Sequence, residues 1–288
     1  MQGNLKTKIE SVLNDKIIKQ ISVAGGCINN AEVVITEGGN NYFIKSNSNS
    51  AKDMFLKEAS GLRELEKANA IRVPKVIHIG SNFLILENIS QNTKSNTFWK
   101  DFGRAFAKLH RITSGSFGFY EDNYIGSSQQ KNITNSIESK NWTEFFFTKR
   151  ILFQYKLAET NGHVDRQLKD AFLQFESKIE SIFKDLIIVP SLLHGDLWSG
   201  NYITDEKGNA CLIDPAVYYG HREADLAMTK LFGGFDSMFY SAYNEEYPLE
   251  DGYDYRENIY KLYHVLNHLN LFGKGYYNQA ISLIKFYL

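Results

Sequence analysis

The chain has 288 residues, of which 43% are hydrophobic and 23% charged, and its formal net charge at pH 7 is −1. This composition is ordinary for a soluble globular protein, and the near-zero charge disfavours electrostatic binding to nucleic acid or to a membrane surface. Two cysteines, Cys27 and Cys211, are too few for a disulfide framework or a cysteine-based metal cluster.

Hydropathy along the chain predicts a cytoplasmic protein. No apolar run approaches the roughly 20 residues that a membrane-spanning helix needs. Charges are spread through the first 21 residues, MQGNLKTKIESVLNDKIIKQI, so we expect no signal peptide. Neither a membrane nor a nucleic acid is therefore an expected partner.

The N-terminal part of the chain predicts a small antiparallel sheet. Residues 5–20 have the pattern of an amphipathic helix, and three short apolar segments follow, QISVAGG, AEVVIT and NYFIK. The turn-forming sequences INN and EGGNN separate these segments, which therefore predict a three-stranded meander. After a helix over residues 51–69, the stretch VPKVIHIGSNFLILENIS predicts two more strands around an Asn turn.

A carboxylate lies on the apolar face of the helix predicted over residues 51–69. Glu58 shares a helical stripe with Met54, Leu62 and Leu65. A buried charge is costly unless it is paired, and Lys45, at the end of NYFIK, is the nearest upstream candidate. The sequence therefore predicts a Lys45–Glu58 ion pair, with a partly exposed Glu58 at the edge of the stripe as the alternative.

The pattern of the sequence changes near Glu87–Ser90. The stretch FWKDFGRAFAKLHRI repeats large apolar residues at helical spacing, and most of the remaining chain predicts helices, apart from residues 190–215. We therefore expect an α+β protein of two lobes. Residues 1–88 form a five-stranded antiparallel sheet with one key helix, and residues 89–288 form a larger, mainly helical lobe.

Polar residues gather around the stretch HGDLWSGN, residues 194–201. The segments NYIT, DEKGN and ACLID follow it and predict a hairpin that pairs Thr204 with Ala210. The same register brings Asn201 beside Asp214, with Asp196 just before them. Amide and carboxylate oxygens suit Mg²⁺, so Asn201 and Asp214 are candidate metal ligands. Asp196 is a candidate base that accepts a proton from a substrate hydroxyl.

Together with Lys45 and Glu58, these residues occur in the order of the kinase phosphoryl-transfer template. The chain also resembles the fructosamine-3-kinase (ketosamine kinase) family, which has the protein-kinase-like and aminoglycoside-phosphotransferase-like fold. The resemblance covers nearly the whole sequence and includes Gln130 and Asn132. Its most specific parts are Trp198 within LLHGDLWSGN and the motif IDPAVYYGHREADLAM; other matching segments are AGGCINN, FIK, KEASGL, FGFYEDNYIGS, NWTEFFFTKRILFQYKLA and LNHLNLFG.

The resemblance implies an ATP- and Mg²⁺-dependent kinase that phosphorylates a ketosamine hydroxyl. The resulting 3-phosphate is labile and releases the amine, which is deglycation. By the same resemblance Asp196 is the base, Asn201 and Asp214 bind the metal, and Asp225 bonds the catalytic-loop backbone. The residues assigned to the nucleotide are Lys45, Glu58, Gly25, Gly26, Glu87, Asn88, Ile89 and Ser90.

The sequence departs from protein kinases and from its own family at several positions. AGGCINN is not a GxGxxG loop, so we expect less complete phosphate cover by backbone amides. HGD replaces HRD and IDP replaces DFG, so we expect no activation-loop phosphorylation switch. Leu271 stands where the family often has a second His, which bears on the contacts to the substrate.

Several side chains allow two interpretations. Cys27 is an inert thiol or, as in some relatives, a site of redox-sensitive dimerisation, whereas Cys211 is expected in the core. Trp198 lines the substrate site or positions the loop, with a place in the core as the alternative. His268 is expected to line the substrate cleft and His264 to pack, with half of a metal site as the alternative for this pair. Asp122 and Asn123 form a turn or border the acceptor site.

Two other functions compete with a ketosamine kinase. One is a kinase of a different hydroxyl, such as an aminoglycoside or a choline-like alcohol; the other is an inactive kinase-like binding protein. The near-neutral composition offers little support for a polycationic acceptor, and retention of Lys45, Asp196, Asn201 and Asp214 argues against inactivity. Expected partners are ketosamine small molecules or glycated proteins, and the expected oligomeric state is a monomer or weak dimer.

Overall fold

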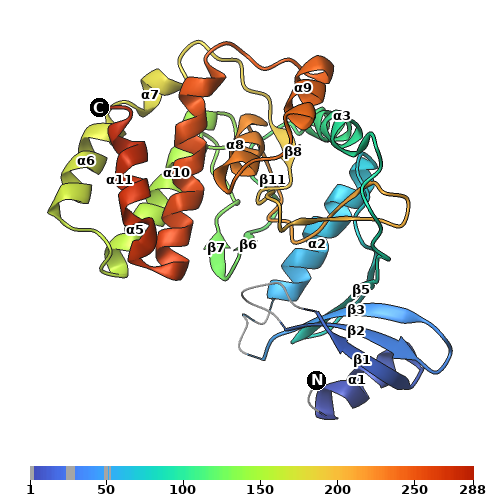
Figure 1. The fold of residues 1–288 in the computed structure, drawn as a ribbon. Coiled ribbons are helices and arrows are strands. Elements are labelled where there is room, and N and C mark those ends of the chain that lie inside the picture. Colours follow the sequence, from blue (N-terminus) through green and yellow to red (C-terminus); the bar gives the residue numbers. More distant parts are fainter. Residues whose placement is uncertain (1–2, 24–29, 49–50, 52) are drawn as a thin grey trace. The chain divides into compact units, whose positions relative to one another are not determined.

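Figure 1 shows a computed structural model of the chain, which describes residues 3–23, 30–48, 51 and 53–288. The chain divides into two compact units. Unit 1 comprises Met1–Phe98 and Tyr202–Asp214, and unit 2 comprises Trp99–Asn201 and Pro215–Leu288. Unit 1 therefore extends beyond residue 88 and contains a second segment from later in the chain. The functional division at residue 88 stays a prediction.

Unit 1 contains the predicted five-stranded antiparallel sheet, with strand order β1-β2-β3-β5-β4. Buried aliphatic and aromatic side chains from α1 and four of the strands form its core. Helix α2 packs against β4 and β5. The elements of unit 1 are α1 (Gly3–Leu13), β1 (Ile17–Ser22), β2 (Asn30–Thr36), β3 (Asn41–Ser46), α2 (Met54–Ala68), β4 (Val76–Ile79), β5 (Phe83–Glu87), β9 (Tyr202–Thr204) and β10 (Ala210–Leu212).

The helix predicted over residues 5–20 is wrong in its second half. Helix α1 ends at Leu13, Asn14 adopts a left-handed φ of 49°, and Ile17–Ser22 forms strand β1. Asn is one of the few residues that tolerate this conformation, which ends a helix. The β-branched residues that follow pair with β2, so sheet pairing overrides the amphipathic pattern.

The hairpin predicted after HGDLWSGN is confirmed in unit 1. Strand β9 pairs with β10 antiparallel, with Thr204 opposite Ala210 and Tyr202 opposite Leu212. Asp205 fixes the turn because its Oδ1 accepts hydrogen bonds from the amides of Lys207 and Asn209, at 2.9 and 2.8 Å. Cys211 is fully buried, as expected for a core residue.

Unit 2 is mainly helical, as the sequence predicts. Its 20-residue helix α10 packs against α5, α8 and α11 (Figure 1). None of the helices in the described part of the chain is long and apolar enough to cross a membrane. The elements are α3 (Phe98–His110, whose first residue belongs to unit 1), β6 (Asn123–Ile125), β7 (Ser128–Gln130), α4 (Trp142–Phe146), the π-helix η1 (Phe147–Leu152), α5 (Phe153–Thr160), α6 (Arg166–Glu176), α7 (Ile179–Ile182), β8 (Ser191–Leu193), β11 (Tyr218–Gly220), α8 (Glu223–Leu231), α9 (Ser237–Glu246), α10 (Tyr253–Phe272), the 3₁₀-helix η2 (Lys274–Tyr276) and α11 (Tyr277–Lys285).

Candidate active site

Unit 1 contains an ion-pair cluster centred on Lys45. The ammonium donates to Glu58 Oε1 at 2.6 Å, and it also contacts Asp214 Oδ1. Strand β3 supplies Lys45, helix α2 supplies Glu58, and Asp214 follows strand β10. The Lys45–Glu58 ion pair predicted from the apolar stripe is therefore present, and the cluster adds a carboxylate that lies 169 residues further along the chain.

Burial and the neighbouring opposite charges act in opposite directions on the pKa values of Lys45 and Glu58. Burial alone would lower the pKa of Lys45, but Asp214 and Glu58 raise that pKa well above its usual value. Burial raises the pKa of Glu58, and the Lys45 ammonium offsets only part of this rise. Lys45 is thus a permanent cation near neutral pH, and its two carboxylate partners give it a fixed position.

The catalytic-loop candidate in unit 2 begins directly after strand β8. Strand β8 pairs antiparallel with β11, and Ala216 N donates to His194 O at 2.9 Å. Gly195 has a φ of +85°, in the left-handed region. A side chain there would overlap the carbonyl oxygen of Ala216, so both its conformation and its surroundings require glycine.

Asp225 on α8 binds the backbone of this loop. Its carboxylate accepts hydrogen bonds from the amides of His194 and Gly195, at 2.7 and 2.8 Å. Its Oδ2 also lies 3.3 Å from Nε2 of His110, whose Nδ1 lies 2.8 Å from Tyr243 Oη. Burial alone would raise the pKa of Asp225, but these hydrogen bonds lower it below its usual value. The loop-bonding contact expected of Asp225 is therefore observed.

Asp196 and Asn201 contact one another within the loop. Asn201 Nδ2 donates to Asp196 O at 2.7 Å and to Asp196 Oδ2 at 3.1 Å. The amide nitrogen of Asn201 is thus occupied by Asp196, and its carbonyl Oδ1 is the atom suited to a hard cation. One carboxylate oxygen of Asp196 likewise is held in place by the amide.

The donor set of Asn201 and Asp214 fits magnesium. Both residues supply oxygen atoms, and Mg²⁺ is commonly held by one or two protein groups together with substrate phosphates. The described residues include no group of three or more His, Cys, Asp and Glu side chains that would hold a metal without such phosphates. Asn201 belongs to unit 2 and Asp214 to unit 1, so their predicted meeting stays a prediction.

Trp198 and His268 belong to one row of aromatic rings in unit 2. Phe232 lies between them, with ring centroids 5.7 Å from Trp198 and 5.0 Å from His268. His268 Nδ1 is 2.8 Å from the carbonyl oxygen of His264, so Nδ1 carries the proton and Nε2 is a hydrogen-bond acceptor. Burial lowers the pKa of His268, which favours its neutral form. His264 is buried, consistent with the packing role expected of it.

Asp122 and Asn123 have structural contacts. Asp122 Oδ1 accepts from the amides of Asn132 and Ile133, at 2.8 and 3.1 Å. Asn123 Oδ1 accepts from Gln130 and Asn132, and its Nδ2 donates to Val217 O at 2.8 Å. These bonds hold the β6–β7 hairpin. Asn123 is the first residue of β6 and Asp122 directly precedes it, so neither residue lies in the turn at residues 126–127. Their place at the border of the acceptor site stays a prediction.

The segment predicted to contact the nucleotide base follows strand β5. Asn88 Nδ2 donates to Asn41 Oδ1 at 3.3 Å, and Ile89 is buried. The Glu87 carboxylate accepts from Arg72 Nη2 at 2.8 Å and from the amide of Lys75 at 3.2 Å, so its side chain has protein partners. Gly25, Gly26 and Cys27, the remaining candidates of the phosphate loop, lie outside the described residues.

The structure also places supporting residues that the sequence did not single out. Arg150, in the π-helix η1, is fully buried; its Nη2 donates to Asn132 Oδ1 at 2.7 Å and its guanidinium lies 4.1 Å from the Tyr218 ring. His110 contacts Asp225, which in turn bonds the backbone of the candidate catalytic loop. Arg150 and His110 both make their contacts with residues more than 15 positions away in the chain. The only local signal for His110 was its place at the end of an apolar helix.

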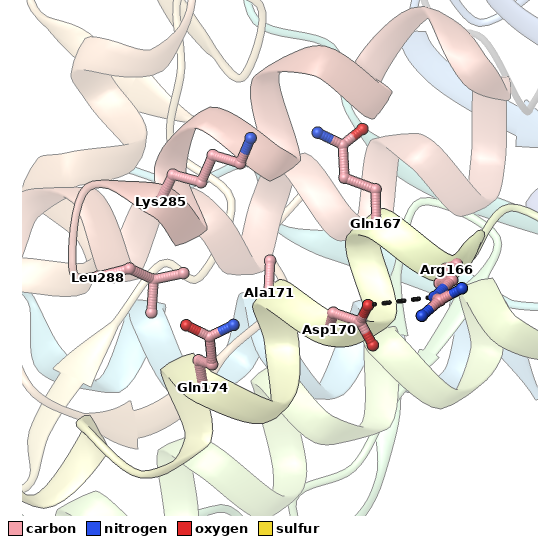
Figure 2. A pocket seen from close by; sticks show the side chains of 7 residues that line it. All are labelled: Arg166, Gln167, Asp170, Ala171, Gln174, Lys285 and Leu288. Atoms are coloured by element: carbon pink, nitrogen blue, oxygen red, sulfur yellow. Dashed lines mark ion pairs between the residues drawn. The ribbon is translucent and has the colours of Figure 1, made fainter.

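A surface pocket of about 490 Å³ lies elsewhere in unit 2, between α6 and α11 (Figure 2). Arg166 pairs with Asp170 across one helical turn of α6, and Lys285 extends from α11 on the other side. None of the candidate site residues within the described part of the chain lines this pocket.

Substitutions of Glu58 separate its catalytic from its structural contribution. Glu58→Leu completes the apolar stripe while Lys45 keeps Asp214 as a partner, so we expect an unchanged or higher melting temperature. Turnover should fall by up to ~10²-fold, because the ammonium loses its fixed position. Glu58→Gln should lower turnover with a modest change in stability. Melting and turnover are measured together, with Glu66→Leu on the exposed face of α2 as the control. Full activity of Glu58→Leu would show that the pair does not position Lys45.

Comparison with known proteins identifies the family. A model of the fructosamine kinase family matches residues 1–288. The chain is 40% identical to a probable ketoamine kinase of Enterococcus faecium over 96% of this chain and 99% of the relative. It is 39% identical to a chloroplastic protein-ribulosamine 3-kinase of Oryza sativa subsp. indica over 95% of this chain and 80% of the relative.

Solved structures agree with this result. A putative fructosamine-3-kinase from Haemophilus somnus matches with a TM-score of 0.86 at 29% identity, covering 99% of this chain and 96% of the other. A thermostable mutant of an aminoglycoside phosphotransferase shares the fold, with a TM-score of 0.65 at 15% identity and coverage of 98% and 96%. These likenesses confirm the protein-kinase-like fold, and the family match over the full sequence shows that the chain belongs to the fructosamine kinase family.

Proposed function

We propose that this protein transfers a phosphoryl group from ATP to a hydroxyl of a ketosamine. The observation that carries the proposal is the cluster in which Lys45 contacts both Glu58 and Asp214. A fixed cation beside a candidate metal-binding carboxylate is the arrangement that a kinase needs for the phosphates of a nucleotide. Family membership and the names of the two relatives, a ketoamine kinase and a ribulosamine 3-kinase, support the same reaction.

In this mechanism each residue has a distinct task. Lys45 binds the phosphates and is kept in position by Glu58. Asp196 accepts the proton of the attacking hydroxyl, and the hydrogen bond from Asn201 orients its carboxylate. Asp225 holds the loop backbone, so that the base is not displaced during the reaction.

Magnesium and ATP are the cofactor and cosubstrate that this site would take. Asn201 Oδ1 and Asp214 would hold Mg²⁺, which neutralises charge on the phosphates when it is bound. Glu87, Asn88, Ile89 and Ser90 would contact adenine. Glu87 would do so through its backbone, because its side chain already has protein partners. Gly25 and Gly26 would lie near the phosphates.

The aromatic row of Trp198, Phe232 and His268 is the proposed acceptor side of the site. Neutral His268 presents Nε2 as an acceptor for a sugar hydroxyl, and the rings offer apolar faces to the carbon skeleton. Fructosamine, ribulosamine and erythrulosamine adducts are the substrates to compare, either as small molecules or on protein lysines. Loss of the labile phosphate frees the amine, so the biological outcome is deglycation. We further propose a cytoplasmic monomer or weak dimer.

ATP consumption with and without acceptor tests this proposal against its alternatives. We expect hydrolysis or transfer to rise strongly when a model ketosamine is added, and to stay at its basal level with an aminoglycoside or with choline. Stimulation by one of the latter alone would instead indicate a kinase of another hydroxyl. Nucleotide binding without turnover on any acceptor would indicate an inactive binding protein.

A further inference from the structure

One guanidinium in unit 1 contacts three carboxylates from two distant segments. Arg72, in the loop between α2 and β4, donates through Nη2 to Glu87 Oε1 at 2.8 Å. Its Nη1 donates to both oxygens of Glu206, at 2.8 and 2.7 Å, and to Asp205 Oδ2 at 3.3 Å. We call Arg72, Glu87, Asp205 and Glu206 the Arg72 cluster. It joins the end of β5 to the turn of the β9–β10 hairpin.

Backbone hydrogen bonds connect the same segments. The amide of Leu212 donates to Arg72 O at 2.8 Å, which places β10 alongside the α2–β4 loop. Beyond β5, Asn92 Nδ2 donates to Glu206 O at 3.1 Å, and the amide of Ser95 donates to Gly208 O at 3.1 Å. The segment from Glu87 to Ser95 is therefore attached to the hairpin both before and after the residues Asn88–Ser90.

The Arg72 cluster depends on Arg72, because this residue supplies the positive charge that offsets three carboxylates. Without the guanidinium, three carboxylates would remain close together and repel one another. A lysine would keep one positive charge but lacks the fork of donors that serves Glu87 on one side and Asp205 and Glu206 on the other. Asp205 is the most buried carboxylate of the cluster, with a side chain 4% exposed, so solvent screens its charge poorly.

We propose that Arg72 is a positioning residue for nucleotide binding. By holding Glu87 to the hairpin turn, it fixes the backbone that presents Asn88–Ser90 to adenine, and it occupies the Glu87 carboxylate. This inference rests on the proposed function, because the adenine-contacting role of that segment belongs to it. In this assignment Arg72 acts on the segment Asn88–Ser90 alone, through its partners Glu87, Asp205 and Glu206. Its loss therefore weakens nucleotide affinity while the chemical step at saturating nucleotide is kept.

Calorimetric binding of the ATP analogue AMP-PNP with Mg²⁺ tests this role directly. Arg72→Met should weaken binding by about tenfold, and Arg72→Lys should weaken it less. Arg63→Met, which removes an exposed arginine from α2 in the same unit, is the matched control and should bind as the unmodified protein does. In steady-state kinetics Arg72→Met should raise KM for ATP by a similar factor and leave kcat and KM for the acceptor within about twofold.

Glu206→Gln provides a second route if Arg72→Met folds poorly. This change removes one exposed carboxylate of the cluster. In the double variant with Arg72→Lys, the fold-loss in nucleotide affinity should be smaller than the product of the two single-variant losses, because the two residues act in one contact. Wild-type affinity of Arg72→Met, or an equal loss in kcat and in both KM values, would overturn the inference. Failure of the unmodified protein to bind the analogue would overturn the proposed function instead.

Discussion

Replacement of Asp196 by asparagine is expected to lower turnover by ~10²–10⁴-fold, the usual contribution of a positioned general base. Asparagine keeps the shape of the side chain and an oxygen that can accept the hydrogen bond from Asn201 Nδ2. It has no group that takes up the proton of the attacking hydroxyl. The fold and the affinity for ATP should therefore be unchanged, because neither depends on the charge of Asp196.

Turnover, melting temperature and nucleotide affinity are measured on the same preparation of Asp196→Asn. Asp170→Asn on α6 is the matched control, since it makes the same chemical change at an exposed position of unit 2. Near-wild-type turnover of Asp196→Asn would remove this residue from the mechanism. A loss of nucleotide binding would mean that Asp196 has a different role.

Replacement of Asp214 by alanine is expected to abolish activity, a loss of ~10³-fold or more, because the charge stabilisation supplied by a metal is worth several kcal/mol. The alanine variant should also bind Mg·ATP more weakly while its affinity for ATP without magnesium changes less. Lys45 keeps Glu58 as one of its two ion-pair partners in this variant. Comparing affinities with and without Mg²⁺ separates the effect on the metal from the effect on the cation.

Nucleotide affinity with and without Mg²⁺ tests the role of Asp214. The unmodified protein should show a clear gain in affinity on adding magnesium, and Asp214→Ala should lose most of that gain. If the unmodified protein binds the nucleotide equally well in both conditions, Asp214 and Asn201 do not form a metal site. Asp170→Ala again controls for the loss of a carboxylate.

The features that the sequence predicted best are those fixed by short-range geometry. The register of the β9–β10 hairpin follows from one turn, so Thr204 lies opposite Ala210 as expected. The Lys45–Glu58 pair follows from one carboxylate on the apolar stripe of a helix and one lysine on a strand, separated by only 13 residues. In both cases a local pattern left few alternatives.

The features that the sequence did not reveal depend on long-range packing. Nothing local to Arg72 indicates that Asp205 and Glu206, more than 130 residues later, surround it. His110 is linked to the candidate catalytic loop by Asp225, 115 residues later in the chain. The false helix over residues 17–20 has the same origin, since its pattern is amphipathic and the pairing with β2 decides the outcome.

The central claim is tested most directly by detecting the phosphorylated product itself. The protein is incubated with Mg·ATP and a fructosamine or ribulosamine adduct of a lysine derivative, and the reaction is followed by mass spectrometry and ³¹P NMR. We predict a phosphate ester on a sugar hydroxyl of the ketosamine, followed by release of the free amine, and neither product with Asp196→Asn. ATP consumption with no phosphorylated ketosamine in any of these reactions would contradict the account.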